Sequence, residues 1–208
     1  MHTQVDHLVF TCSDLDAGIE HMENKLGVRP AIGGRHPAWG THNALIGLGG
    51  RRYLEVIAPD PDASVPPRAR PESFTAEGAL CLKTWAAAAS ELPDLCARAA
   101  AIGVQLGERA HGSRMRPDGV ELSWSLTNPA CFLFNGVVPF LIDWGRSPHP
   151  GEQAPEGCAL LELRLAHPEH ARVKEVLSAL GYETEVEHAE HAGLVAVIES
   201  PRGRVELH

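Results

Sequence analysis

One series of predicted elements, a strand, a helix and three strands, recurs three times along the 208-residue chain. Each copy opens with an apolar strand, followed by a helix that ends at a glycine. The glycines are Gly27 in LGV, Gly103 in IGV and Gly181 in LGY, at intervals of 76 and 78 residues. This spacing indicates one structural unit used three times. The alternative is three unrelated segments whose glycines happen to align.

The order of the elements predicts an α+β fold of repeated βαβββ modules that form cupped mixed sheets. One helix covers one face of about four strands in each module. The other face is then concave, and two such sheets facing each other form a cleft or an open barrel. The predicted domains are residues 1–60, 76–146 and 157–208, of which the last is a shorter βαβββ-like module.

A glutamate, Glu55, stands in the otherwise apolar stretch RRYLEVIAP, at the end of the first copy. A strand that buries a carboxylate usually provides it with a partner or a metal ion. Glu55 is therefore expected to face something polar.

Several stretches of the first two copies resemble the vicinal oxygen chelate superfamily, and more narrowly its glyoxalase-like branch. The strongest are VDHLVFTCSDLDAGIEHMENKLGVRP, GGRHPAWGTHNALIGL and RRYLEVIAP, with GSRMRPDGVELSWSLT and PFLIDWG downstream. Members of this superfamily pair βαβββ modules, and many hold a divalent metal ion in the cup between them. Isomerase, lyase, dioxygenase and epimerase chemistry all occur on this fold, so the resemblance does not specify the reaction.

The resemblance implies that His7 on the first strand and Glu55 on the last strand of the module are metal ligands. Alternation along a strand agrees with this, because His7 shares a face with Val9, and Glu55 shares one with Tyr53. Zn, Ni, Mn and Fe would all suit such a pair. Glu206, in the similar stretch RVELH, is the predicted third ligand. Other candidates remain open: Glu162, Asp143, His42 and His36. Alternatively, His7 and Glu55 form hydrogen bonds only with each other or with a buried water molecule.

The stretch GGRHPAWGTHNALIG combines turn-forming residues with varied polar chemistry, and binding residues tend to lie in such segments. The candidate substrate-binding residues are Arg35, His36, Trp39, Thr41 and Asn43, together with Trp124 of the second module. Glu55 and His42 are the candidate catalytic bases. The alternative is an exposed hairpin with Trp39 pinned to the core.

Composition excludes several classes of partner. The formal charge is −9, and no Lys/Arg block could follow a phosphate backbone, so nucleic acid is not expected. The apolar stretches are too short to span a bilayer. The start of the chain lacks the pattern of a secretory signal, and the five scattered cysteines form no CxxC pair. We therefore expect a cytoplasmic protein with reduced thiols and no membrane partner.

Three functions are compatible with these features. The first is a divalent-metal-dependent enzyme that acts on a small oxygen-bearing substrate, such as a carbonyl or enediol compound, in the cup. The second is a metal-free protein that binds or sequesters a small molecule, as drug-binding members of the superfamily do, often at the interface of a homodimer. The third is a purely structural or partner-binding domain.

Overall fold

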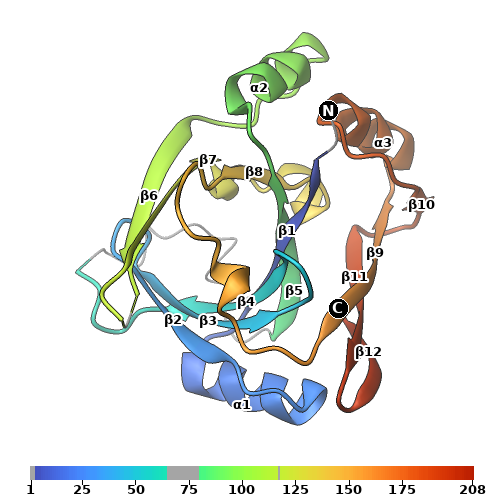
Figure 1. The fold of residues 1–208 in the computed structure, drawn as a ribbon. Coiled ribbons are helices and arrows are strands. Elements are labelled where there is room, and N and C mark those ends of the chain that lie inside the picture. The colour runs from blue at the N-terminus through green and yellow to red at the C-terminus, as the bar shows by residue number, and fades with distance from the viewer. Residues whose placement is uncertain (1–2, 65–79, 117) are drawn as a thin grey trace.

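The computed structural model describes residues 3–64, 80–116 and 118–208. Its strands form one eight-stranded and one four-stranded sheet, and Figure 1 shows that the larger sheet is strongly curved. The α+β fold with cupped sheets is therefore confirmed. No helix in the described ranges is long and apolar enough to cross a membrane.

The first two copies contribute equally to the large sheet. The first copy comprises β1 (Gln4–Thr11), α1 (Leu15–Leu26), β2 (Ala31–His36), β3 (Thr41–Gly47) and β4 (Tyr53–Pro59). The second comprises β5 (Cys81–Ala88), α2 (Leu92–Ala101), β6 (Arg109–Met115), β7 (Glu121–Thr127) and β8 (Phe140–Asp143). The first four positions of its predicted domain, 76–79, lie outside the described residues.

Two short sheets with the same strand order meet at their first strands. The order across the large sheet is β2-β3-β4-β1-β5-β8-β7-β6, in which β1 is parallel to β4 and antiparallel to β5. Each half therefore mirrors the other in strand order. This arrangement is the paired-module cup that the repeat predicts.

Helix α1 shows why the sequence starts and stops this element where it does. The carboxylate of Asp14 accepts a hydrogen bond from the backbone N–H of Ala17, which caps the first turn. Gly27 adopts a left-handed conformation with φ of 77°, and its N–H bonds to the carbonyl of Glu23. The apolar face of the helix then packs on the outer side of β4 and β3.

The third copy follows the same element order but a different strand order. It comprises β9 (Ala159–His167), α3 (His170–Ala179), β10 (Val186–His188), β11 (Gly193–Ser200) and β12 (Gly203–Leu207). Its sheet runs β10-β9-β11-β12, so β10 pairs with β9 rather than with β11. Hydrophobicity patterns predict elements but not which edges pair, and the third copy is not another half of the cup.

The small sheet packs on the outside of the large one and shares its core. Leu165 and Leu177 belong to the same buried cluster as Leu82 and Trp85 of β5. The backbone N–H of Leu82 also donates to the carbonyl of His208. The third copy therefore supports the outer face of the cup near β5.

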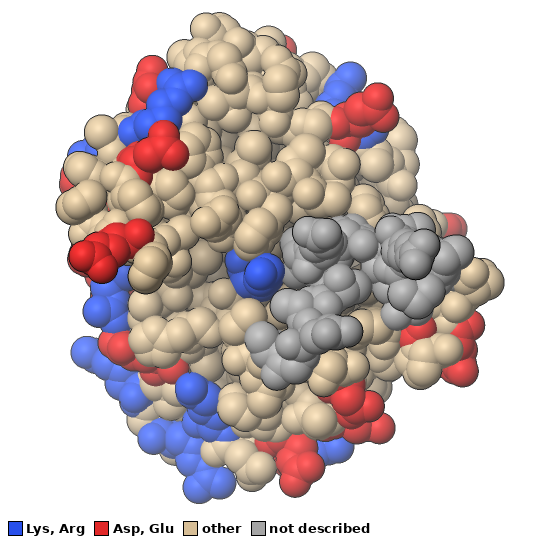
Figure 2. Space-filling view, turned by 180° about the vertical axis from the view of Figure 1, so that it is seen from behind, with Lys and Arg blue, Asp and Glu red and all other residues tan. Residues whose placement is uncertain are grey.

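Charged side chains are mixed in sign over the face shown in Figure 2. Lys and Arg lie among Asp and Glu around the margin of this face. The described surface above the grey residues consists mostly of residues other than Lys, Arg, Asp and Glu.

The two edge strands of the large sheet meet through Arg114 and Gly33. The Arg114 guanidinium on β6 donates a hydrogen bond to the carbonyl of Gly33 on β2. Gly34 has a φ of 152°, and a Cβ built there would lie 3.0 Å from the carbonyl oxygen of Met115 and 3.1 Å from Nη1 of Arg114. Glycine at position 34 is therefore needed for this close approach.

We expect Gly34→Ala to lower the free energy of unfolding by about 1–3 kcal/mol, because the strained backbone and the crowding at β6 both oppose a methyl group. Urea unfolding measures this effect. Gly193→Ala is the control, since a Cβ at position 193 would meet no atom within 4 Å. Equal stability of the two variants would contradict this account of closure.

Candidate functional site

A partly open cavity of about 60 Å³ lies inside the cup. Its wall is part polar and part aromatic. The lining side chains belong to His7, His36, Trp39, Thr41, Asn43, Tyr53, Glu55, Ile57, Arg114, Trp124, Leu126, Pro129, Phe140, Ile142 and Trp144. A water molecule needs roughly 10–15 Å³ on this measure, so the cavity has room for a few small atoms.

Glu55 faces this cavity from β4, and its two carboxylate oxygens have different neighbours. The amide nitrogen of Asn43 donates to Oε1. Oε2 lies 3.8 Å from Nε2 of His7. Glu55 is only 8% exposed, and these contacts supply the polar partners that its position in an apolar strand requires.

Asp6 holds His7 from the other side. The pairing of β1 with β5 is irregular between Val5 and His7, so Asp6 has no partner residue in the register. Such irregularities redirect side chains and often occur beside functional sites. Nδ1 of His7 lies 2.8 Å from Oδ1 of Asp6.

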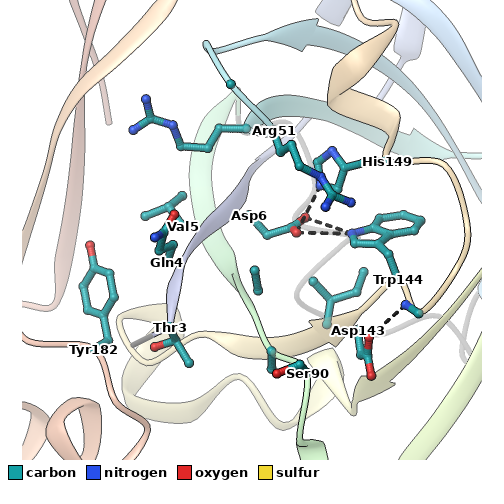
Figure 3. Close-up of a pocket in the computed structure, with 16 residues that line it drawn as sticks. Thr3, Gln4, Val5, Asp6, Arg51, Ser90, Asp143, Trp144, His149 and Tyr182 are labelled. Carbon is teal, nitrogen blue, oxygen red and sulfur yellow. Dashed lines mark hydrogen bonds and ion pairs between the residues drawn. The ribbon is translucent and has the colours of Figure 1, made fainter. Parts of the chain in front are cut away.

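Two further N–H groups converge on the Asp6 carboxylate, as Figure 3 shows. Nε1 of Trp144 donates to Oδ2 at 3.2 Å, and Nε2 of His149 lies 3.1 Å from the same oxygen. His149 precedes the short helix η5 (Pro150–Glu152), where its Nδ1 accepts from the backbone N–H of Gly151. Since Nδ1 of His149 accepts, Nε2 carries the proton and donates to Asp6.

The Asp6 carboxylate is therefore ionised and accepts from its neighbours. Burial alone would raise its pKa, but hydrogen bonds from His149 and His7 outweigh burial and lower the pKa from 3.8 to about 2. An ionised carboxylate cannot donate, so Nδ1 of His7 must carry a proton. In neutral His7, Nε2 is then left with a lone pair on the side of Glu55 and the cavity. Its ring stacks on Tyr53, with centroids 4.6 Å apart.

His36 is a neutral member of the wall. Burial lowers its pKa from 6.5 to about 4, and although Glu55 opposes this shift, the charge of Arg114 adds to it. Its Nδ1 lies 3.0 Å from the hydroxyl of Thr41. At neutral pH it can therefore form hydrogen bonds but carries no charge.

Arg114 brings a buried positive charge to the cavity wall. Its side chain reaches the cavity from β6 and is only 5% exposed. Burial lowers the pKa of its guanidinium, although the charges of Tyr53 and Glu55 oppose that shift. Sequence analysis missed this residue because SRMRPDG looks like a turn. The alternating pattern of β6 would have been the signal.

The structure brings most of the candidate residues together. His7 and Glu55 share the cavity with these candidate substrate-binding residues: His36, Trp39, Thr41, Asn43 and Trp124.

Three candidates lie elsewhere. His42 lies on the outer face of β3, since the neighbouring Thr41 and Asn43 point inward. Arg35 forms ion pairs with Asp60 and Asp62 outside the cavity. Glu206 lies on β12 of the small sheet, where it pairs with Arg164. The register of β3 decides which face His42 occupies, and the strand order separates Glu206 from the cup.

The donor set does not fit a metal ion well. No group of three or more His, Cys, Asp or Glu side chains in the described part of the chain is placed to hold one. The second module contributes Ala86 opposite His7 in the strand register, with Phe140 beside Ala86. Asp143, another candidate ligand, accepts from the N–H of Gly145 outside the cavity. His7 and Glu55 thus remain a pair, beside a buried cation.

A comparison with protein-family models matches residues 5–181 to a family described as "Glyoxalase-like domain". The chain therefore belongs to the glyoxalase-like domain family, and the resemblance stated from its sequence is confirmed. A search of curated proteins finds no match.

A solved structure that covers nearly the whole chain shares its fold. A hypothetical protein from Staphylococcus aureus superposes with a TM-score of 0.65 at 12% identity, covering 97% of this chain and 92% of that one. Methylmalonyl-CoA epimerase from Streptomyces coelicolor, as a variant bound to 2-nitronate-propionyl-CoA, gives 0.48 at 22% identity, covering 72% and 100%. The Mycobacterium tuberculosis epimerase gives 0.42 at 19%, covering 68% and 87%.

Removing the charge of Asp6 should destabilise the fold in a pH-dependent way. We expect Asp6→Asn to lower the free energy of unfolding at pH 7 by about 2 kcal/mol or more, because three buried N–H donors lose their charged acceptor. The pKa of Asp6 is lower in the folded state, so its contribution is present above about pH 4 and is lost as the pH falls toward about 2.

Urea unfolding of both proteins from pH 7 to 3 tests this expectation. The stability difference should shrink as the pH falls. Glu108→Gln, at an exposed position, is the control and should show no comparable effect. A difference that stays constant with pH would contradict the role of the Asp6 charge.

Proposed function

We propose that this protein is a glyoxalase-like enzyme that moves a proton on a small oxygen-bearing substrate, a carbonyl or enediol compound, in the cup. The observation that carries the proposal is the buried chain of Asp6, His7 and Glu55. Asp6 orients the imidazole and Glu55 lies 3.8 Å from its free nitrogen. A base oriented by a carboxylate is the arrangement used in general acid–base catalysis.

His7 would act as the base. Its Nε2 takes a proton from the carbon next to the substrate's carbonyl group, and the charge of Asp6 stabilises the imidazolium that forms. Nε2 then returns the proton to the substrate. Asn43 keeps Glu55 in place through its hydrogen bond, so that Glu55 can balance the charge of protonated His7.

Exclusion of water supports this chemistry. His7 is 3% exposed and is flanked by the rings of Tyr53 and Phe140. Electrostatic interactions are stronger in such surroundings than in water. A proton held between His7 and Glu55 would therefore respond strongly to the charge of a bound substrate.

Metal dependence, which the family resemblance implies, has only His7 and Glu55 to support it within the described ranges. We therefore assign the proton transfer to His7 alone. Reactions of the lyase or dioxygenase kind remain without a supporting observation in this cavity.

A metal-free binding protein is the second candidate. The aromatic part of the wall favours it, because Trp124 and Trp144 lie together with ring centroids 5.2 Å apart. Flat apolar ligands would be held by such a surface. A binding protein requires no proton transfer, so a measurement of proton exchange distinguishes it from the proposed enzyme.

His7→Asn should reduce proton exchange at least about 100-fold. The Asn amide can still donate to Asp6 but provides no basic nitrogen. The measurement is deuterium incorporation from D₂O into small 2-oxo and 2-hydroxy compounds, followed by proton NMR. His42→Gln is the control and should exchange at the wild-type rate, since His42 lies outside the cavity. Exchange that is catalysed equally by His7→Asn would exclude His7 as the base.

Elemental analysis of tag-free protein tests the metal assignment. From the donor set we expect wild type to contain well under one equivalent of Zn, Ni, Mn or Fe, and exchange to persist after treatment with a chelator. Stoichiometric metal that disappears in both His7→Ala and Glu55→Ala would instead establish a metal centre at this pair.

A further inference from the structure

We infer that the cup binds its ligand through a carboxylate group, which pairs with Arg114. The inference rests on the proposed function only in placing the reacting carbon of that ligand beside His7. The ligand class is then a small carboxylic acid with an oxygen on the neighbouring carbon, a 2-oxo or 2-hydroxy acid.

The first observation is an unmatched buried cation. Arg114 is 5% exposed and lines the cavity, and its hydrogen bond goes to the neutral carbonyl of Gly33. Within the ranges that the structure describes, no carboxylate lies at ion-pair distance from it. A buried charge without an ion-pair contact is costly, so an anion that enters this cavity gains a strong partner.

The nearest acidic group inside the cavity does not fill that role. Glu55 attracts Arg114 from a distance, but its oxygens are directed to the amide of Asn43 and the imidazole of His7. An added carboxylate would therefore not displace an existing ion pair. It would occupy the side of the cavity that faces β6.

The geometry of the guanidinium and the size of the cavity select the class of anion. The planar fork of an arginine side chain matches the two oxygens of a carboxylate. The volume of about 60 Å³ favours a compact ligand. The aromatic wall provided by Trp124 and Trp39 suits a flat ligand. A compact, planar 2-oxo acid meets all three conditions.

Binding can be measured without turnover, because three of the four tryptophans, Trp39, Trp124 and Trp144, line the cavity. Tryptophan fluorescence is titrated with pyruvate and lactate, and with the neutral pyruvamide and lactamide as matched controls. Wild type should bind each acid at least about tenfold more tightly than its amide. The preference should vanish in Arg114→Met and persist in part in Arg114→Lys.

Pyruvamide binding and the thermal midpoint of each variant show whether the cup remains folded. If Arg114→Met fails to fold, Arg114→Lys decides alone, and it must retain a reduced preference for the acid. Equal affinity of wild type for acid and amide, an unchanged preference in Arg114→Met, or no binding of either acid would overturn the inference.

The same titration is repeated with His7→Asn to separate this inference from the proposed function. If His7→Asn retains the preference for the acid and loses no deuterium exchange, the carboxylate site is supported and His7 is excluded as the base. If His7→Asn loses exchange but wild type shows no preference for the acid, His7 remains the proposed base and the carboxylate site is rejected.

Discussion

The site depends on one buried carboxylate. Asp6 accepts N–H groups from three parts of the chain: His7 beside it on β1, Trp144 just after β8, and His149 before η5. Trp144 thereby connects the second module to the first strand, and His149 connects the link to the third copy to the same strand. The same contacts decide which nitrogen of His7 is free. The Asp6 carboxylate therefore stabilises the fold and also determines the chemistry of the cup.

Local patterns in the sequence predict the elements and the faces of single strands well. Helix α1 is stopped by Gly27 as expected, and alternation alone puts His7 and Glu55 on inward faces. Pairing between distant strands is not a local property. Hence the altered strand order of the third copy could not be predicted from its hydrophobicity pattern, nor could the separation of Glu206 from the cup.

Two of the residues that sequence analysis missed, Arg114 and His149, act through contacts far along the chain. Arg114 reaches Gly33, and His149 reaches Asp6, although neither pair belongs to a recognisable motif. His42 was predicted to belong to the site but does not. Its chemistry and its segment are suitable, but its side chain lies on the outer face of β3, because Thr41 and Asn43 on either side of it point inward. Residue type and sequence context therefore identify the segment that forms the site, whereas the strand register determines which of its side chains face the cavity.

The two halves of the cup share a strand order but not a chemistry. Imidazole and carboxylate come from β1 and β4, whereas the matching strands β5 and β8 present Ala86 and Phe140. On the proposed function, a substrate then meets a proton acceptor from one side only. A proton that leaves one carbon of the substrate and returns to the neighbouring carbon would then do so on one face of the enediol, so the enzyme would form only one of the two mirror-image products.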